Sequence, residues 1–300
     1  MNGLPLSKSQ LDVAHVLSTQ PPEPDHVLPG LPVGAVGALV APGGTGKTML
    51  ALQLAISLAT GQPSPLQFSA GPKRQEPTTV VLIAAEETGG EMHRRLFYLV
   101  NALSPVANTV NGGERRREYH DLLQKHLRVY SLAGRSRLRL DGDESAEPSI
   151  QALKEVAKGA RLLILDPMRQ IHGGDENDSW AMTSLVQACQ SIAHQSHCAL
   201  LLTHHTTKHA TMNGLGDQAG ASRGSAALTD AVRWQVNLSR LDEKLAKQYG
   251  IEVDGPAHHI RADLAKANYL AAQPPLVFRK GEGGALELRT ALIKVRRGRA

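Results

Sequence analysis

A glycine-rich segment at residues 41–48 carries the residue types that bind phosphate. It follows an apolar run at 35–40, predicted as a strand, and precedes an apolar stretch predicted as a helix. In that setting glycine N–H groups wrap phosphates, Lys47 reaches the terminal ones and the Thr48 hydroxyl ligates Mg²⁺. Residue 41 is alanine where the motif prefers glycine, but its Gly-Lys-Thr end is intact. The sequence therefore predicts a P-loop for ATP or another nucleoside triphosphate with Mg²⁺, whose other phosphate-binding positions are Gly43, Gly44, Thr45 and Gly46.

Asp166 ends a second apolar run, Leu-Leu-Ile-Leu at 162–165. A carboxylate at the tip of a buried parallel strand lies at the carboxyl edge of the sheet, where ligands bind in α/β folds. There it can hold the water shell of Mg²⁺. An ordinary polar strand end is the alternative, and the P-loop upstream favours the metal role.

Two glutamates follow a third apolar run at 80–85. Hydrolysis of a phosphoanhydride needs a base that orients water. Glu86 comes first off the predicted strand, so the sheet fixes its direction, and we predict it as the catalytic base. Glu87 is the alternative base, and a surface acid pair is the non-catalytic interpretation.

Thr203-His204-His205 ends a strand predicted to begin at Ala199. A neutral imidazole can donate to a phosphate oxygen and relay the loss of that phosphate into the loop that follows. His204 and His205 are therefore both candidate phosphate sensors. A solvated strand end is the alternative.

The elements that must position these residues alternate along the chain. Short apolar runs are separated by amphipathic stretches, which is typical of a mostly parallel sheet with helices on both faces. Beyond Thr229 the pattern changes to longer alternating runs, predicted as antiparallel strands that extend the sheet. We find no internal repeat and no linker. The sequence predicts an α/β domain over 31–300, preceded by a polar, proline-rich arm at 1–30.

Composition limits the class of protein. The 300 residues are 41% hydrophobic and 20% charged, enough to build a core, and no apolar run is long enough for a membrane helix. Two cysteines favour a reducing compartment, and we expect a cytoplasmic protein. A net charge of +5 is compatible with a polyanionic partner, while 3% aromatic residues argue against a base-stacking platform.

The motifs together resemble the core of the RecA/DnaB-type hexameric helicase family, and within it the RepA type of small plasmid replicative helicase. The resemblance extends from about residue 24 to the last strand. Besides the segments above, it rests on Glu91-Met-His-Arg-Arg-Leu96, Asp166-Pro-Met-Arg169, Ala221-Ser-Arg-Gly-Ser225, Asp230-Ala-Val-Arg-Trp-Gln235 and Lys266-Ala-Asn-Tyr269. It implies a homo-oligomeric, hexameric ring with ATP between neighbours, which travels 5′ to 3′ on single-stranded DNA and unwinds forked duplex. A plasmid initiator and a primase are possible further partners.

The resemblance also implies a role for each matching residue. It assigns phosphate and magnesium binding to Lys47 and Thr48, catalysis to Glu86, the second magnesium contact to Asp166, and phosphate sensing to His205 or His204.

Arg233 resembles the arginine finger that reaches into the site of a neighbouring subunit, and Lys266 is a second candidate for that contact. A cation placed at the transferring phosphate contributes ~10³-fold or more. The alternative for Arg233 is pairing with Asp230 within a strand. Strand alternation would place those two on opposite faces, which weakens this alternative without removing it.

Two loops follow the motif strands. The loop at 170–178 is acidic, whereas the loop at 206–223 is glycine-rich and net basic. Because the second loop continues from the predicted sensor, we expect it to line the ring channel, with Lys208 and Arg223 on DNA phosphates. A loop free in solvent is the alternative.

Two other functions remain open from the sequence. A RecA-like, DNA-stimulated ATPase could act as a regulatory or recombination accessory without unwinding, and it would share every catalytic residue. A P-loop phosphotransferase is less favoured, because it would need an arginine-rich lid rather than a long β-rich extension.

Overall fold

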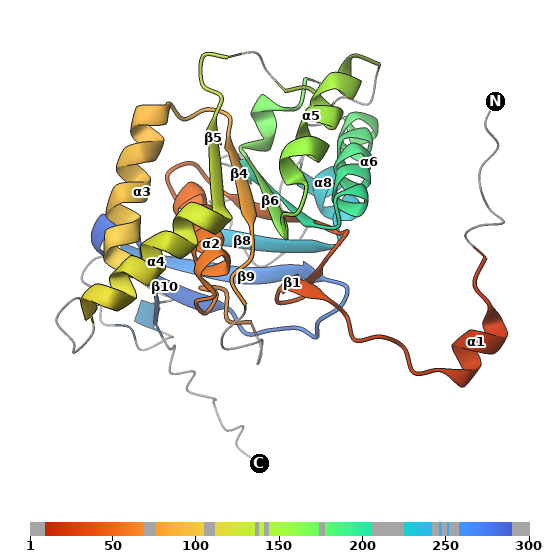
Figure 1. The fold of residues 1–300 in the computed structure, drawn as a ribbon, viewed down its shortest axis with the longest axis horizontal. Helices are drawn as coiled ribbons and strands as arrows, with labels where there is room; N and C mark the ends of the chain where they lie inside the picture. Colours follow the sequence, from red (N-terminus) through yellow and green to blue (C-terminus); the bar gives the residue numbers. More distant parts are fainter. Residues whose placement is uncertain are drawn as a thin grey trace.

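The computed structural model describes residues 10–68, 76–104, 112–135, 138–140, 144–173, 178–205, 225–241, 246–247, 251 and 258–289. Its core is a nine-stranded sheet in the order β11-β10-β9-β8-β3-β7-β6-β4-β5, with helices on both faces (Figure 1). The predicted fold class, a mostly parallel α/β sheet with an antiparallel C-terminal extension, is confirmed.

The parallel half of the sheet is built from short apolar strands: β3 (Val36–Ala41), β7 (Ala199–His205), β6 (Leu162–Asp166), β4 (Val80–Ala84) and β5 (Leu127–Ser131). All but β5 are buried along nearly their whole length, as expected for strands covered on both faces. The helices of this half are α2 (Lys47–Thr60), α3 (Gly89–Leu103), α4 (Gly112–His126), α5 (Glu147–Ala157) and α6 (Ser179–Gln195).

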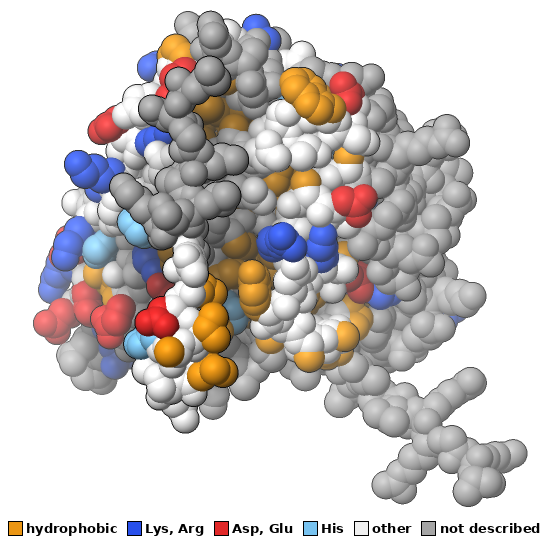
Figure 2. Space-filling model, turned by 90° about the vertical axis from the view of Figure 1, so that its right-hand side faces the viewer, with side chains coloured by type: hydrophobic (Ala, Val, Ile, Leu, Met, Phe, Trp, Pro, Cys, Tyr) orange, Lys and Arg blue, Asp and Glu red, His pale blue; other side chains and the backbone are white. Residues whose placement is uncertain are grey.

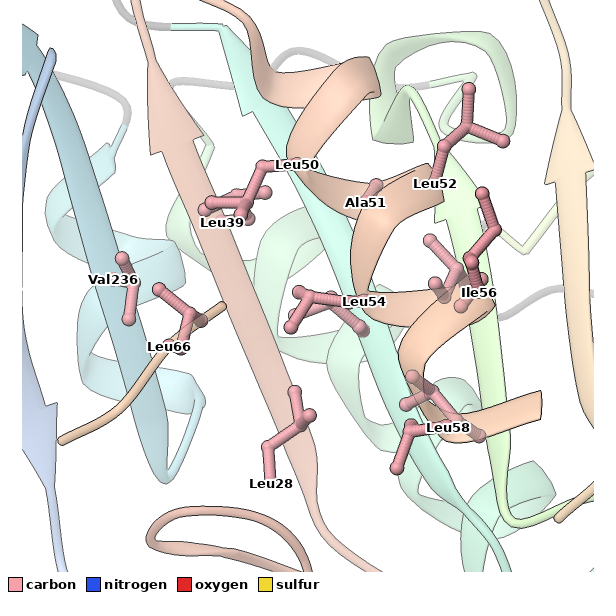
Figure 3. Close-up of a cluster of buried hydrophobic side chains, with 14 of the residues drawn as sticks. Leu28, Leu39, Leu50, Ala51, Leu52, Leu54, Ile56, Leu58, Leu66 and Val236 are labelled. Carbon is pink, nitrogen blue, oxygen red and sulfur yellow. The ribbon is translucent and has the colours of Figure 1, made fainter. Parts of the chain in front are cut away.

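Strand alternation divides the apolar side chains between two cores. In β7, Leu201 packs in the core with α2, whereas Leu200 and Leu202 pack in the core with α5 and α6. On the first side, Leu50 and Leu54 of α2 point toward the strands that carry Leu39 and Val236 (Figure 3). The same alternation continues into the polar strand ends, so it decides which of them face α2.

The extension begins with β8 (Trp234–Arg240), which pairs parallel with β3. It continues with three antiparallel strands, β9 (His259–Ala267), β10 (Leu276–Lys280) and β11 (Leu286–Arg289). The prediction of antiparallel strands is therefore correct from β9 onward, while β8 joins the parallel set. Gln53 of α2 binds the edge strand β11, because its side-chain amide donates to the Leu286 carbonyl at 3.0 Å and accepts from the Leu286 N–H at 2.9 Å.

Several elements were not predicted from the sequence. Helix α4 is strongly polar, and Tyr119 is its one buried side chain with a large apolar surface. The two-residue and three-residue strands β2 (Leu31–Pro32) and β1 (His26–Leu28) form a small separate sheet, and α8 (Ser225–Ala231) packs on α6. Such elements lack the apolar periodicity on which sequence interpretation depends.

The N-terminal arm carries a short helix, α1 (Val13–Ser18), which buries none of its residues. It projects from the body on the side of α6, joined by an extended segment (Figure 1). The arm meets the body where Arg161 donates to the Asp25 carboxylate at 2.7 Å. Within the described residues, no helix combines the length and apolar character needed to cross a bilayer.

Gly37 of β3 lies where the Trp234 ring packs against the neighbouring strand. A Cβ on Gly37 would lie 2.8 Å from Trp234 Cε3 and 3.2 Å from Leu31 Cδ1, in a fully buried region. We expect Gly37→Ala to lower the free energy of unfolding by about 1–3 kcal/mol, because the overpacked core must shift. Urea unfolding measures this change. The control is Gly113→Ala in α4, where no atom lies within 4 Å of the new methyl group; an equal loss in both variants would contradict the packing argument.

Candidate active site

The turn between β3 and α2 has the backbone of a phosphate-binding loop. Gly44 and Gly46 adopt φ values of 72° and 111°, which residues with a side chain rarely adopt. Helix α2 begins at Lys47 with no side-chain cap and no acidic residue in its first turn. Its N-terminal N–H groups and positive dipole end are therefore available to an anion.

Lys47 is buried at the base of this loop. Its Nζ donates to the carbonyl of Ala41 at 2.9 Å and lies 3.0 Å from Nδ1 of His205. Burial lowers the pKa of Lys47 to about 8, although the carboxylates of Asp166 and Glu86 act in the opposite direction. A phosphate beside this desolvated ammonium would supply the negative charge that the surroundings provide only in part.

Asp166 lies beside Lys47 because of strand register. It ends β6 next to β7, whose Thr203 donates to its Oδ1. In β6, Leu162 and Ile164 face the α2 core, so alternation turns Asp166 to the same side. The carboxylate is buried and held by Thr203, and it lines the same pocket as Lys47 and Thr48.

The two glutamates after β4 have different surroundings. Glu87 forms an ion pair with Arg95 of α3 at 2.6 Å. Glu86 is exposed toward the pocket, and its Oε1 accepts from Nε2 of Gln170 at 3.0 Å. Gln170, in the 3₁₀ turn after β6, was not predicted from the sequence. Its place shortly after the Asp166 strand was the available signal.

Alternation also separates the two histidines. His205 lines the pocket beside Lys47, whereas His204 is buried and faces the opposite core. Burial, followed by the charges of His205 and Lys47, lowers the pKa of His204 to about 4. Burial and Lys47 also lower the pKa of His205, which favours its neutral form. Because an ammonium only donates, Nδ1 of His205 accepts, and the ring proton lies on Nε2, where it can be donated to a ligand.

These side chains line an open pocket of about 420 Å³. Three of its lining residues, Lys280, Gly284 and Leu286, come from the β10–β11 hairpin, more than 230 positions after the P-loop. Met49 of α2 also lines the pocket, and a Cβ on Gly284 would lie 2.9 Å from its Cε. Sequence interpretation missed this wall, since no local pattern links a strand end to a distant loop.

The donors present fit a nucleotide with Mg²⁺. Cationic Lys47 and the N-terminus of α2 suit the phosphates, while Thr48 and the Asp166 carboxylate supply oxygen ligands of the kind Mg²⁺ prefers. The Thr45 hydroxyl is buried without a hydrogen-bond partner, so it has an unused donor in the loop. Among the described residues, no group of three or more His, Cys, Asp or Glu could hold a metal alone. This suits an ion that shares its ligands with phosphate and water.

Comparison with protein families agrees with this geometry. A family model described as an AAA domain (AAA_25) matches residues 5–211. The chain belongs to this AAA domain family. The matched region includes the P-loop, Glu86, Asp166 and both histidines, whereas the extension from β8 onward lies outside it.

Two solved structures share the fold of this AAA domain. The ATPase domain of a DnaB-like helicase matches with a TM-score of 0.58 over 85% of this chain and 85% of that chain, at 14% identity. The RadB recombinase matches with a TM-score of 0.50 over 87% of this chain and 93% of that chain, also at 14% identity. Together they confirm a RecA-like P-loop fold.

The remaining predicted residues of the AAA domain lie away from the pocket or outside the described residues. Arg233 is exposed and precedes β8, and its N–H donates to the carbonyl of Val36, the first residue of β3. The P-loop follows the other end of β3, roughly 17 Å away at strand rise. Lys266 donates to the carbonyls of Thr229 and Asp230 at 2.7 and 3.1 Å. Neither basic group reaches the pocket of its own chain.

The strand interpretation of Arg233 and Asp230 is wrong, because Asp230 lies in α8 and Arg233 in the bend that follows. No ion pair joins them in the described part of the chain. Lys208 and Arg223 lie outside the described residues.

The lowered pKa of Lys47 predicts a specific pH dependence of stability. Between about pH 8 and the ordinary value of 10.5, the folded chain binds fewer protons on this amine than the unfolded chain. The free energy of unfolding of the wild type should therefore rise with pH relative to Lys47→Met, by roughly 1 kcal/mol per pH unit. Urea unfolding of both proteins without ligand at pH 7, 8, 9 and 10 tests this. A difference that stays constant with pH would contradict it.

Proposed function

We propose that this AAA domain is an NTP-dependent, ring-shaped replicative DNA helicase of the plasmid RepA type. In this proposal ATP hydrolysis between subunits drives 5′ to 3′ movement on single-stranded DNA and unwinding of duplex. The observation that carries the ATPase part is the convergence of Lys47, Asp166, Glu86 and His205 on one pocket at the carboxyl edge of the sheet.

Each pocket residue has a distinct part in hydrolysis. Lys47 binds the terminal phosphates, while Thr48 and Asp166 hold Mg²⁺, which would neutralise charge on those phosphates. Glu86 orients and deprotonates the attacking water, because it faces the pocket without a cationic partner, whereas Glu87 is paired with Arg95. His205 detects the terminal phosphate through its Nε2 proton and its contact with Lys47.

We assign the finger of the neighbouring subunit to Arg233, with Lys266 as the second candidate. The exposure of Arg233 and its distance from the pocket of its own chain support a contact between subunits. Lys266 already donates to two carbonyls after α8, so it would have to exchange those contacts to reach a phosphate.

The N-terminal arm supports the proposed ring. Its aliphatic side chains Leu11, Val13, Val16 and Leu17 are each more than half exposed. The face on that side of the molecule carries hydrophobic side chains in small groups between charged ones (Figure 2). Covering such an isolated apolar helix is favourable, and we propose that α1 packs on an adjacent copy of the chain.

DNA binding is assigned to the loop that continues from β7. His205 is the last residue of β7, so loss of a contact at His205 is transmitted directly to residue 206. In this proposal Lys208 and Arg223 contact DNA phosphates without reading bases.

A second function is a RecA-like, DNA-stimulated ATPase that acts in regulation or recombination without unwinding. The similarity in fold to the RadB recombinase favours keeping it as the alternative. A phosphotransferase is less favoured, because the described pocket is walled by a β-hairpin rather than an arginine-rich lid.

A forked duplex with a single-stranded tail distinguishes these functions. With ATP and Mg²⁺, the wild type should release the labelled strand, and Lys47→Ala should lose at least about 100-fold in both ATP turnover and strand release. Lys158→Ala, an exposed lysine at the end of α5, is the matched control. ATP turnover stimulated by DNA without strand release would reject the helicase and support the accessory function.

Arg233→Ala tests catalysis between subunits. It should bind ATP as the wild type does but lose turnover by ~10³-fold, because the cation acts on the transition state. Mixing inactive Arg233→Ala with inactive Lys47→Ala should restore part of the activity, since some interfaces then combine an intact pocket with an intact finger. Arg128→Ala, an exposed arginine in β5, is the control. Near-normal turnover by Arg233→Ala would reject this residue, and a fully active monomer in sedimentation would reject the shared site.

A further inference from the structure

The nucleotide pocket has a basic residue that comes from the C-terminal extension. Lys280, the last residue of β10, is partly buried in the pocket wall. Its Nζ donates to the carbonyl of Gly44 in the P-loop at 3.3 Å. It lies outside the region matched by the family model, which ends at residue 211.

A second cation lies at the same peptide. Arg240, the last residue of β8, is exposed, and a Cβ placed on Gly44 would lie 3.6 Å from its Nη2. Among the described residues no carboxylate forms an ion pair with Lys280 or Arg240. Burial and the charge of Arg240 both lower the pKa of Lys280. Two cations held beside one glycine without an acid form a site that favours an anion.

The position of the pair selects phosphate over the other parts of a nucleotide. Gly44 belongs to the loop whose backbone binds phosphate, whereas Met49 and Leu286 give the pocket its apolar lining. The ammonium of Lys280 has three donors, and one hydrogen bond to Gly44 leaves two for a ligand.

We propose that Lys280, reinforced by the positive charge of Arg240, binds phosphate oxygens of the nucleoside di- or triphosphate in the pocket of its own chain. This inference rests on the proposed function, since it concerns the same site. Lys280 stands on a strand of the rigid sheet beside the P-loop before any neighbour joins. It therefore binds substrate and transition state about equally, so its loss raises KM and leaves kcat nearly unchanged. Arg233 is expected to show the opposite pattern.

The test compares Lys280→Met, which keeps the apolar stem, with Arg289→Ala in the same hairpin. Arg289 lies at the far end of β11, pairs with Glu287 and does not line the pocket. Binding of fluorescent ATP and ADP analogues should weaken about tenfold in Lys280→Met, as expected for a lost charge-assisted hydrogen bond. Arg240→Met should weaken both by a smaller factor, and Lys280→Arg should retain most of the affinity. Steady-state hydrolysis should show KM raised about tenfold, with kcat within about twofold of the wild type.

Several outcomes would overturn this inference. Unchanged ATP and ADP affinity in Lys280→Met is one, and an equal loss in Arg289→Ala is another. Unchanged nucleotide affinity together with weaker binding of single-stranded DNA, or with dissociation of the oligomer, would assign the pair to DNA or to a neighbouring copy instead. Thermal unfolding of each variant without nucleotide separates loss of binding from loss of folding, and Lys280→Arg provides a folded variant in which the charge is kept.

Lys47→Ala separates the two levels of the argument. If Lys47→Ala abolishes nucleotide binding while Lys280→Met leaves it intact, the inference fails and the ATP site stands. If neither variant changes nucleotide binding, the proposed ATP site fails as well.

Discussion

The desolvated ammonium of Lys47 is the interaction on which the rest of the site depends. It is held where β3 becomes α2, by the Ala41 carbonyl and by His205 of the neighbouring strand. Its burial makes the charged form costly until an anion arrives. Asp166 and Glu86 compensate only in part, because they face the same pocket from adjacent strand ends. A site built in this way favours a ligand that carries strong negative charge.

Parallel register converts this local chemistry into a shared site. β3, β7, β6 and β4 are neighbours that run in the same direction, so their polar ends meet along one edge of the sheet. Alternation then decides direction, since it places Asp166 and His205 on the α2 side and His204 in the opposite core. The remote position of Arg233 follows from the same rule, because it lies at the start of a strand parallel to β3.

The sequence was sufficient for features that depend on local pattern. Apolar runs located the parallel strands, and glycine spacing located the P-loop. It could not rank His204 against His205, because that choice requires knowing which face α2 covers. Lys280 and Gln170 were missed for a different reason: their roles arise from contacts with Gly44 and Glu86 across the fold. Helix α4 was missed because its sequence is polar on nearly every side.

The paired hydrogen bonds from Gln53 to Leu286 have a consequence for how copies of this chain can meet. An edge strand normally offers free N–H and C=O groups on which a foreign strand can grow the sheet. Here the amide of a helix residue occupies both groups of Leu286, in the manner of one more strand. Polymerisation by strand addition is thereby blocked at this point of the rim. Contacts between copies at this point must form through side chains, which can dock and release without any backbone ladder being broken.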